Sequence, residues 1–315
     1  MRRWTLTRRA WLLAVSLLGT ASNSCAAQIP AAAGGRDLTF FHVSDTHYGL
    51  SPIGDATVPN LVDKMNRLPG TAYPTNLGGV VGTPRGVIHT GDMTNDGKKE
   101  QWEKFVRDYG LTGRDGRLKW PVYESFGNHD GGDRLPVRIA IRERNKTRVG
   151  LSNISSNGLH YAWDWDGVHF VMCGISPGTT CRPYDPQDSI GFLADDLRKN
   201  VGPGGRPVVL LHHFGFDKSH SMNWWPAEWR TSYFELIKDY NVAGILHGHA
   251  HEPFIYQWNG LDIYHPPHFR QKGPKESGPV THGFFVFRIT GDELIVAERK
   301  WDDTWGMTAR KPLKK

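Results

Sequence analysis

Several apolar runs in this sequence end in side chains that can bind a metal ion. In the first, residues 38–43 are followed by Asp45 and His47, an Asp-x-His pair. Positions i and i+2 of a strand point the same way, so the pair predicts two ligands of one ion. Asp-x-His pairs are common by chance, so the prediction depends on whether the pattern recurs.

The pattern does recur after four later apolar segments. Their polar endings are Gly91-Asp92-Met93-Thr94-Asn95-Asp96, Gly127-Asn128-His129-Asp130, His212-His213 and Gly248-His249-Ala250-His251. Glycine precedes three of the endings and lets the backbone turn sharply there. In open α/β sheets, ligands bind beyond the carboxyl ends of the strands. We therefore expect these side chains to converge in space.

The spacing of apolar residues predicts one mixed α/β domain at 37–305, after a linker at 28–36 and before a basic tail at 306–315. Helices are expected at 58–68, 99–109, 138–148, 189–200 and 227–240, and the charged helix at 138–148 is expected to face solvent. Strands are expected at 38–43, 86–90, 122–126, 160–165, 168–175, 207–211, 242–247, 254–258, 261–264, 283–289 and 294–299.

Composition and charge limit the classes of protein to which this chain could belong. The 315 residues include 36 glycines and 20 prolines, which favours a loop-rich globular chain. The formal net charge is +6, but residues 1–27 carry four arginines and no acidic residue. The remainder has 34 basic and 32 acidic residues, so its near-neutral charge argues against a nucleic-acid-binding module.

Residues 1–27 predict a cleaved signal peptide. A basic start is followed by an apolar stretch at 10–19, which is shorter than the roughly 20 residues of a spanning helix. Residues 7–12 resemble a twin-arginine export signal, and an ordinary Sec signal is the alternative. The mature protein is expected to be periplasmic or secreted without a stable membrane anchor, with lipidation of Cys25 as a minor alternative. Cys173 and Cys181 would form a disulfide, or Cys173 would be a free buried thiol.

Taken in order, the five motifs resemble the calcineurin-like metallophosphoesterase superfamily. The resemblance spans residues 45–251, about two thirds of the chain. It implies a four-layer α/β/β/α sandwich of two mixed sheets. The antiparallel strands of the C-terminal part would then lie in the outer part of the second sheet.

The resemblance also implies two metal sites that share one carboxylate. One ion would be held by Asp45, His47, Asp92 and His251, and the other by Asp92, Asn128, His212 and His249. His213 would then contact the ligands without binding a metal ion itself. Mixed oxygen and imidazole ligands without a thiolate suit two divalent or trivalent ions of Mn, Fe or Zn.

In this family the histidine after the asparagine lies near the scissile ester. His129 would accordingly stabilise the phosphoryl charge or protonate the leaving oxygen, and Asp130 would orient its ring. A buried structural pair is the alternative for these two residues. The implied reaction is hydrolysis of a small-molecule phosphoester, in which a metal-bound hydroxide attacks phosphorus.

Departures from the subfamily patterns favour the bacterial phosphodiesterase branch. Asn95 stands where purple acid phosphatases have an iron-binding tyrosine. Asp96-Gly97-Lys98 and Asp130 differ from the pattern of the Ser/Thr protein phosphatases. A broad phosphomonoesterase remains an alternative, as does a non-catalytic metal-binding or sensory protein. The oligomeric state is not specified by the sequence.

Other residues near the motifs have less specific interpretations. Phe214, Phe216, Trp224, Trp225 and Trp229 form either a substrate rim or a clasp that holds their own loop to the domain. His42 and His89 lie inside apolar strands and are expected to be hydrogen-bonded core residues. His268 and His282 have no assigned role, with approach to the site as the minor alternative.

Overall fold

The computed structural model describes residues 35–132, 134–180, 185–216, 224–268 and 282–313. The chain divides into two units, Met1–Pro30 and Ala31–Lys315, and every described residue belongs to the second. The expected signal peptide, Cys25 and Cys181 therefore lie outside the described residues. Among the described helices, none has the length and apolar character needed to cross a membrane.

The first sheet contains six strands in the order β13-β12-β11-β1-β2-β3. β1, β2 and β3 are parallel because helices cross between them, whereas β1 pairs antiparallel with β11. The strands are β1 (Asp37–Val43), β2 (Pro84–His89), β3 (Val122–Glu124), β11 (Gly283–Thr290), β12 (Glu293–Lys300) and β13 (Trp305–Pro312).

The second sheet contains seven strands in the order β4-β5-β6-β7-β8-β10-β9. β6, β7, β8 and β10 run parallel, and antiparallel hairpins complete both edges. The strands are β4 (Leu151–Ile154), β5 (Tyr161–Trp165), β6 (Val168–Met172), β7 (Val208–Leu211), β8 (Val242–Leu246), β9 (Phe254–Trp258) and β10 (Leu261–His265). In the β5–β6 turn, Asp166 and Gly167 have φ angles of 47° and 80°, as a tight hairpin turn requires.

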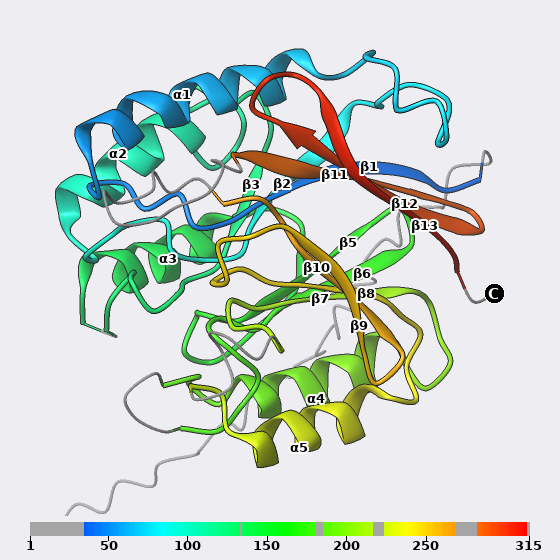
Figure 1. Cartoon of the computed structure of the whole chain (residues 1–315). Coiled ribbons are helices and arrows are strands. Elements are labelled where there is room, and N and C mark those ends of the chain that lie inside the picture. Colours follow the sequence, from blue (N-terminus) through cyan, green and yellow to red (C-terminus); the bar gives the residue numbers. More distant parts are fainter. Residues whose placement is uncertain (1–34, 133, 181–184, 217–223, 269–281, 314–315) are drawn as a thin grey trace, which may run out of the picture. The chain divides into compact units, whose positions relative to one another are not determined.

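Helices cover the outer face of each sheet, as Figure 1 shows. On the first sheet lie α1 (Pro52–Arg67), α2 (Lys99–Tyr109) and α3 (Pro136–Thr147), and on the second lie α4 (Ser189–Asn200) and α5 (Ala227–Ile237). Side chains alternate along β1, so Phe40 joins the core with Phe170 and Phe287 between the sheets, while Phe41 packs in the core that includes α1. The four-layer sandwich predicted from the sequence is confirmed.

α1 begins at Pro52 and β6 ends at Met172, where the sequence predicted residues 58 and 175, and the structure departs from the predictions in three further places. β4 and β13 were not expected, and β13 extends the domain past residue 305 into the segment predicted to be a basic tail. β11, β12 and β13 belong to the first sheet and not to the second, because β11 pairs with β1. Helix α3 is also less solvated than its charge suggests, since Arg138 and Asn145 are buried.

Candidate metal centre

Five side chains beyond the strand ends lie on backbone with positive φ. The angles are 55° at Asp45, 44° at His47, 54° at Asp92, 79° at His249 and 63° at His251. Residues other than glycine rarely adopt this left-handed conformation, which costs about 1–3 kcal/mol at each position. Because this strained backbone recurs at all five positions, we infer that the loops keep it in order to place these five side chains.

Backbone hydrogen bonds hold the first two of these loops side by side. The N–H of Asp45 donates to the carbonyl of Gly91, and the N–H of His47 donates to the carbonyl of Asp92, both at 3.0 Å. β1 already ends at Val43. The loop geometry therefore brings Asp45 and His47 together, and the strand alternation inferred from the sequence is not the reason.

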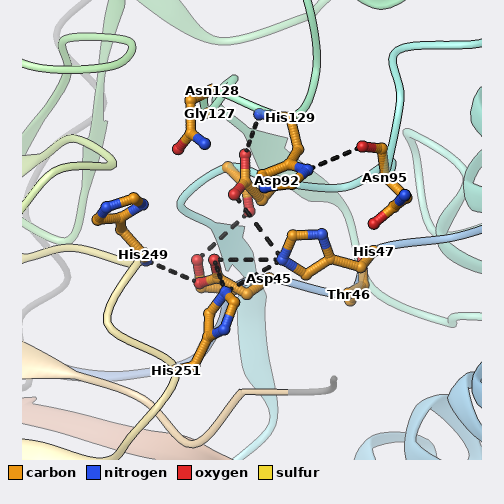
Figure 2. A network of polar contacts seen from close by, with 12 residues as sticks. Asp45, Thr46, His47, Asp92, Asn95, Gly127, Asn128, His129, His249 and His251 are labelled. Carbon is orange, nitrogen blue, oxygen red and sulfur yellow. Dashed lines mark hydrogen bonds and ion pairs between the residues drawn. The ribbon is translucent and has the colours of Figure 1, made fainter. Parts of the chain in front are cut away.

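Asp45, His47, Asp92 and His251 form a first cluster, drawn in Figure 2, with one ligand atom from each within 4.8 Å of all the others. The Nε2 atoms of His47 and His251 are 3.1 Å apart. Oδ1 of Asp45 lies 3.3 Å from Nε2 of His251, and Oδ2 of Asp92 lies 3.8 Å from Nε2 of His47. This is the set that the family resemblance assigned to one ion.

Asp92, His213 and His249 form a second cluster of the same tightness. Nε2 of His213 lies 3.2 Å from Oδ2 of Asp92 and 3.1 Å from Oδ1 of Asn128. Asn128 therefore adds an amide oxygen at this position. Because Asp92 belongs to both clusters, its carboxylate is placed to bridge two ions.

His212 lies in the core and not at the centre. Its Nδ1 is 2.6 Å from the carbonyl oxygen of Phe214, and its ring packs against Trp225 and Tyr233 with centroids 5.1 and 5.6 Å away. Adjacent side chains of an extended chain point to opposite sides, so only one member of the His212-His213 pair can face the carboxylates. The structure replaces His212 by His213 in the candidate ligand set.

The hydrogen bonds of His213 define which ring nitrogen faces the centre. Its Nδ1 lies 2.8 Å from the carbonyl oxygen of Thr90 and so carries the proton, which directs Nε2 at Asp92 and Asn128. Burial lowers the pKa of His213, but the charge of Asp92 outweighs it and raises the pKa to about 9. The position is therefore built to hold positive charge between oxygen acceptors.

Burial and neighbouring charges also shift the pKa values of four other candidate ligands. Burial lowers the pKa of both His47 and His249 to about 3, so their rings are neutral at neutral pH. Burial alone would raise the pKa of Asp45 and Asp92, but His251 and His213, respectively, hold these values well below the usual range. Carboxylate and imidazole donors without a thiolate form a set that fits two cations.

Two glycines allow the loops to approach the carboxylates. A Cβ on Gly127 would lie 2.2 Å from Oδ1 of Asp92, and a Cβ on Gly248 would lie 2.0 Å from Oγ of Ser44 and 2.8 Å from Oδ2 of Asp45. Any other residue would push these groups out of place. This close approach explains why glycine precedes the polar residues in both motifs.

Asp130 does not orient the ring of His129. Its carboxylate accepts hydrogen bonds from the backbone N–H groups of Met93 (3.2 Å) and Gly127 (2.9 Å), and so joins the loops after β2 and β3. Nδ1 of His129 lies instead 2.8 Å from the carbonyl oxygen of Asn95. The predicted His129–Asp130 pair is therefore corrected: Asn95 orients the ring through its backbone.

His129 lies at the open side of the first cluster. Its side chain is exposed, and its ring meets the ring of His47 edge to face with centroids 4.7 Å apart. The backbone N–H of His129 donates to Oδ1 of Asp92 at 2.8 Å, as Figure 2 shows. The bridging carboxylate and the proposed acid are thus part of one hydrogen-bonded unit.

Further histidines surround the centre. Nε2 of His42 bonds the hydroxyl of Thr90 at 3.0 Å, and Nε2 of His89 bonds that of Thr46 at 3.1 Å, which confirms both as hydrogen-bonded core residues. His268 is buried and its ring stacks on that of His251 at 5.2 Å, in agreement with the alternative that it approaches the site. His268 follows the end of β10 at His265 after two prolines, which places it beyond a strand end like the histidines of the motifs.

Cys173 is a free, buried thiol, and burial raises its pKa far above the usual range. Because such a thiol is neither ionised nor accessible, it has no part in the chemistry of the centre. Of the two alternatives for this residue, the structure bears out the free buried thiol.

Comparison with known proteins agrees with this centre. The family model described as calcineurin-like phosphoesterase matches residues 38–253. A dimetal phosphatase from Danio rerio is 11% identical with a TM-score of 0.59, and the match covers 88% of this chain and 99% of that one. GAP50, the anchor in the inner membrane complex of Plasmodium, is 12% identical with a TM-score of 0.60, covering 89% and 90%. No curated protein sequence matches the chain.

The solved structures share less than 25% identity with the chain and therefore support the fold alone. The family model covers more than half of the chain, from β1 to the last histidine motif and beyond it. The chain belongs to the calcineurin-like phosphoesterase family of metal-dependent phosphoester hydrolases.

Proposed function

We propose that this protein is an exported hydrolase of small-molecule phosphodiesters that works with two metal ions. One observation carries the proposal: two clusters of imidazoles and carboxylates meet at Asp92. Two bound cations would supply charge for the phosphoryl oxygens and activate water near neutral pH. Mn, Fe and Zn all suit the donor set, and the ions that are available decide among them.

The protein itself supplies position and a proton. Asn95 holds Nδ1 of His129, so Nε2 is the atom that can reach a substrate. Water adds to phosphorus and releases a proton to solvent, the P–O bond to the leaving group breaks, and the leaving oxygen takes the proton from Nε2 of His129, which solvent then reprotonates. The hydrogen bond from the backbone N–H of His129 to Oδ1 of Asp92 fixes the position of the proton donor relative to the metal centre.

A diester preference is supported by the motif endings and by their place in the structure. Asn95 occupies the position of the iron-binding tyrosine of purple acid phosphatases, and here its carbonyl orients His129. The near-neutral charge of residues 28–315 also favours a small substrate over nucleic acid. A broad phosphomonoesterase is the other activity that the same centre could support.

The test is hydrolysis of bis-p-nitrophenyl phosphate and p-nitrophenyl phosphate by protein loaded in turn with Mn, Fe and Zn. We expect metal-dependent release of p-nitrophenol with a higher kcat/KM for the diester, and no activity in Asp92→Ala. A higher kcat/KM for the monoester would select the phosphomonoesterase. Absence of hydrolysis with every metal would select a non-catalytic metal-binding or sensory role.

Export rests on the sequence of residues 1–27 and has its own test. The full chain is expected in the periplasmic fraction or the medium, and deletion of residues 2–27 should retain it in the cytoplasm. Replacing both Arg8 and Arg9 with lysine should block export if the twin-arginine route is used. Undiminished export of this lysine variant would indicate the Sec route.

A further inference from the structure

Of the two neighbouring tryptophans that follow β7, Trp225 lies in the core and Trp224 lies beside the metal centre. Trp225 is fully buried, its Nε1 donates to the carbonyl of Pro177 at 3.1 Å, and its ring packs against Phe216 and Tyr233. Trp225 and Phe216 therefore act as a clasp that holds this part of the chain to its own domain, as one of the two interpretations of the sequence expects. Trp224 is 41% exposed and is the only aromatic side chain among the exposed large apolar residues in the described part of the chain.

Trp224 lies beside the second cluster. Its ring centroid is 4.7 Å from that of the ligand candidate His249 and 5.7 Å from that of Phe214. Phe214 is fully buried and is itself 4.8 Å from His249. The buried ring of Phe214 therefore packs against the indole of Trp224. The rest of the indole is exposed to solvent next to the metal centre.

The two sides of the centre differ in chemistry. The proposed proton donor His129 packs on His47, a member of the first cluster only, whereas Trp224 packs on His249, a member of the second cluster only. In the view of Figure 2, His47 and His249 lie on opposite sides of the two carboxylates. A phosphoryl group bound to cations that Asp92 would share between the two clusters would thus have a proton donor on one side and an indole on the other.

We infer that Trp224 is a stacking platform for an aromatic substituent that stays on phosphorus, such as an aryl group or a nucleobase. This inference rests on the proposed function, since it takes the leaving group to be on the His129 side. A diester has such a second substituent and a monoester has none. An aromatic group that covers the exposed indole removes apolar surface from water and gains ring stacking. Trp224 is in this way a specificity-determining residue.

The test keeps the leaving group constant and varies the retained group. The substrates are phenyl p-nitrophenyl phosphate and methyl p-nitrophenyl phosphate, and the measured quantity is the ratio of their kcat/KM values. Trp224→Ala is expected to lower this phenyl-to-methyl ratio by about fivefold, as the loss of one ring contact would. Trp224→Phe should keep most of it.

Ile154→Ala is the matched control, because Ile154 is also 41% exposed and lies on β4, at the edge of the second sheet. It should leave the ratio unchanged. Equal losses on both substrates in Trp224→Ala would overturn the platform, because such losses would indicate a structural role. The platform would also be overturned if Trp224→Phe showed the same low phenyl-to-methyl ratio of kcat/KM as Trp224→Ala.

A binding measurement separates this inference from the proposed function. Titration calorimetry of the metal-loaded protein with phenylphosphonate and methylphosphonate requires no turnover. Tighter binding of phenylphosphonate that disappears in Trp224→Ala supports the platform even where no ester is hydrolysed, in which case only the proposed function fails. A preference that Trp224→Ala retains contradicts the platform.

Discussion

Replacing His213 with asparagine is expected to lower kcat/KM by about 10²- to 10³-fold and to remove one of two bound metal ions. An asparagine amide can still donate to the carbonyl of Thr90, as Nδ1 of His213 does, but it has no atom at the position of Nε2. The variant therefore deletes one ligand and keeps the local hydrogen bond. Loss of several kcal/mol of transition-state charge stabilisation corresponds to a decrease of this size.

His212→Asn is the matched comparison. Its amide can replace Nδ1 as the donor to the carbonyl of Phe214, and no ligand atom is lost. This variant should retain two ions per chain by elemental analysis, although its stability decreases because the ring is buried in the core. If His212→Asn lost an ion and His213→Asn did not, the ligand assignment would have to be reversed.

Replacing Glu124 with glutamine is expected to reduce the free energy of unfolding by about 3–5 kcal/mol, because two guanidinium groups then lose their buried counter-charge. Glu124 ends β3 and is fully buried. Its Oε1 accepts from Nε of Arg144 and its Oε2 from Nη2 of Arg148, both at 2.8 Å. These pairs hold α3 against the first sheet. Chemical denaturation measures the change.

The effect of Glu124 should depend on pH. Burial alone would raise the pKa of its carboxyl, but Arg144 and Arg148 lower it below the ordinary value of 4.5. A lowered folded-state pKa gives stability that is complete above pH 4.5 and is lost as the pH falls through the folded value. The difference between wild type and Glu124→Gln should therefore shrink below pH 4.5.

Glu143→Gln provides the control for this pair. Glu143 is 63% exposed and pairs with Lys146 on the surface of α3, so its loss should leave the stability nearly unchanged. Equal stabilities of the two variants would show that the buried pairs contribute nothing net. A stability difference that does not shrink as the pH falls below 4.5 would assign the loss to packing and not to charge.

Much of the fold could be predicted because local pattern and tertiary environment agree. The predicted helices at 99–109 and 189–200 coincide with α2 and α4, whose apolar residues face the core. β4 and β13 were missed because both are edge strands with half-exposed, largely polar side chains. Such strands are defined by the partner strand they pair with, which a single sequence does not reveal.

The sequence by itself determined which residue types gather and in what order, since apolar strands that end in Asp, Asn or His must bring these side chains to one edge. Only the tertiary structure decided that His213 and not His212 faces Asp92, that the carbonyl of Asn95 orients His129, and that Trp224 borders the centre while Trp225 is buried. The reason is physical: in each case hydrogen bonds and packing with distant segments, such as the bond from His213 to Thr90, set the direction of a side chain.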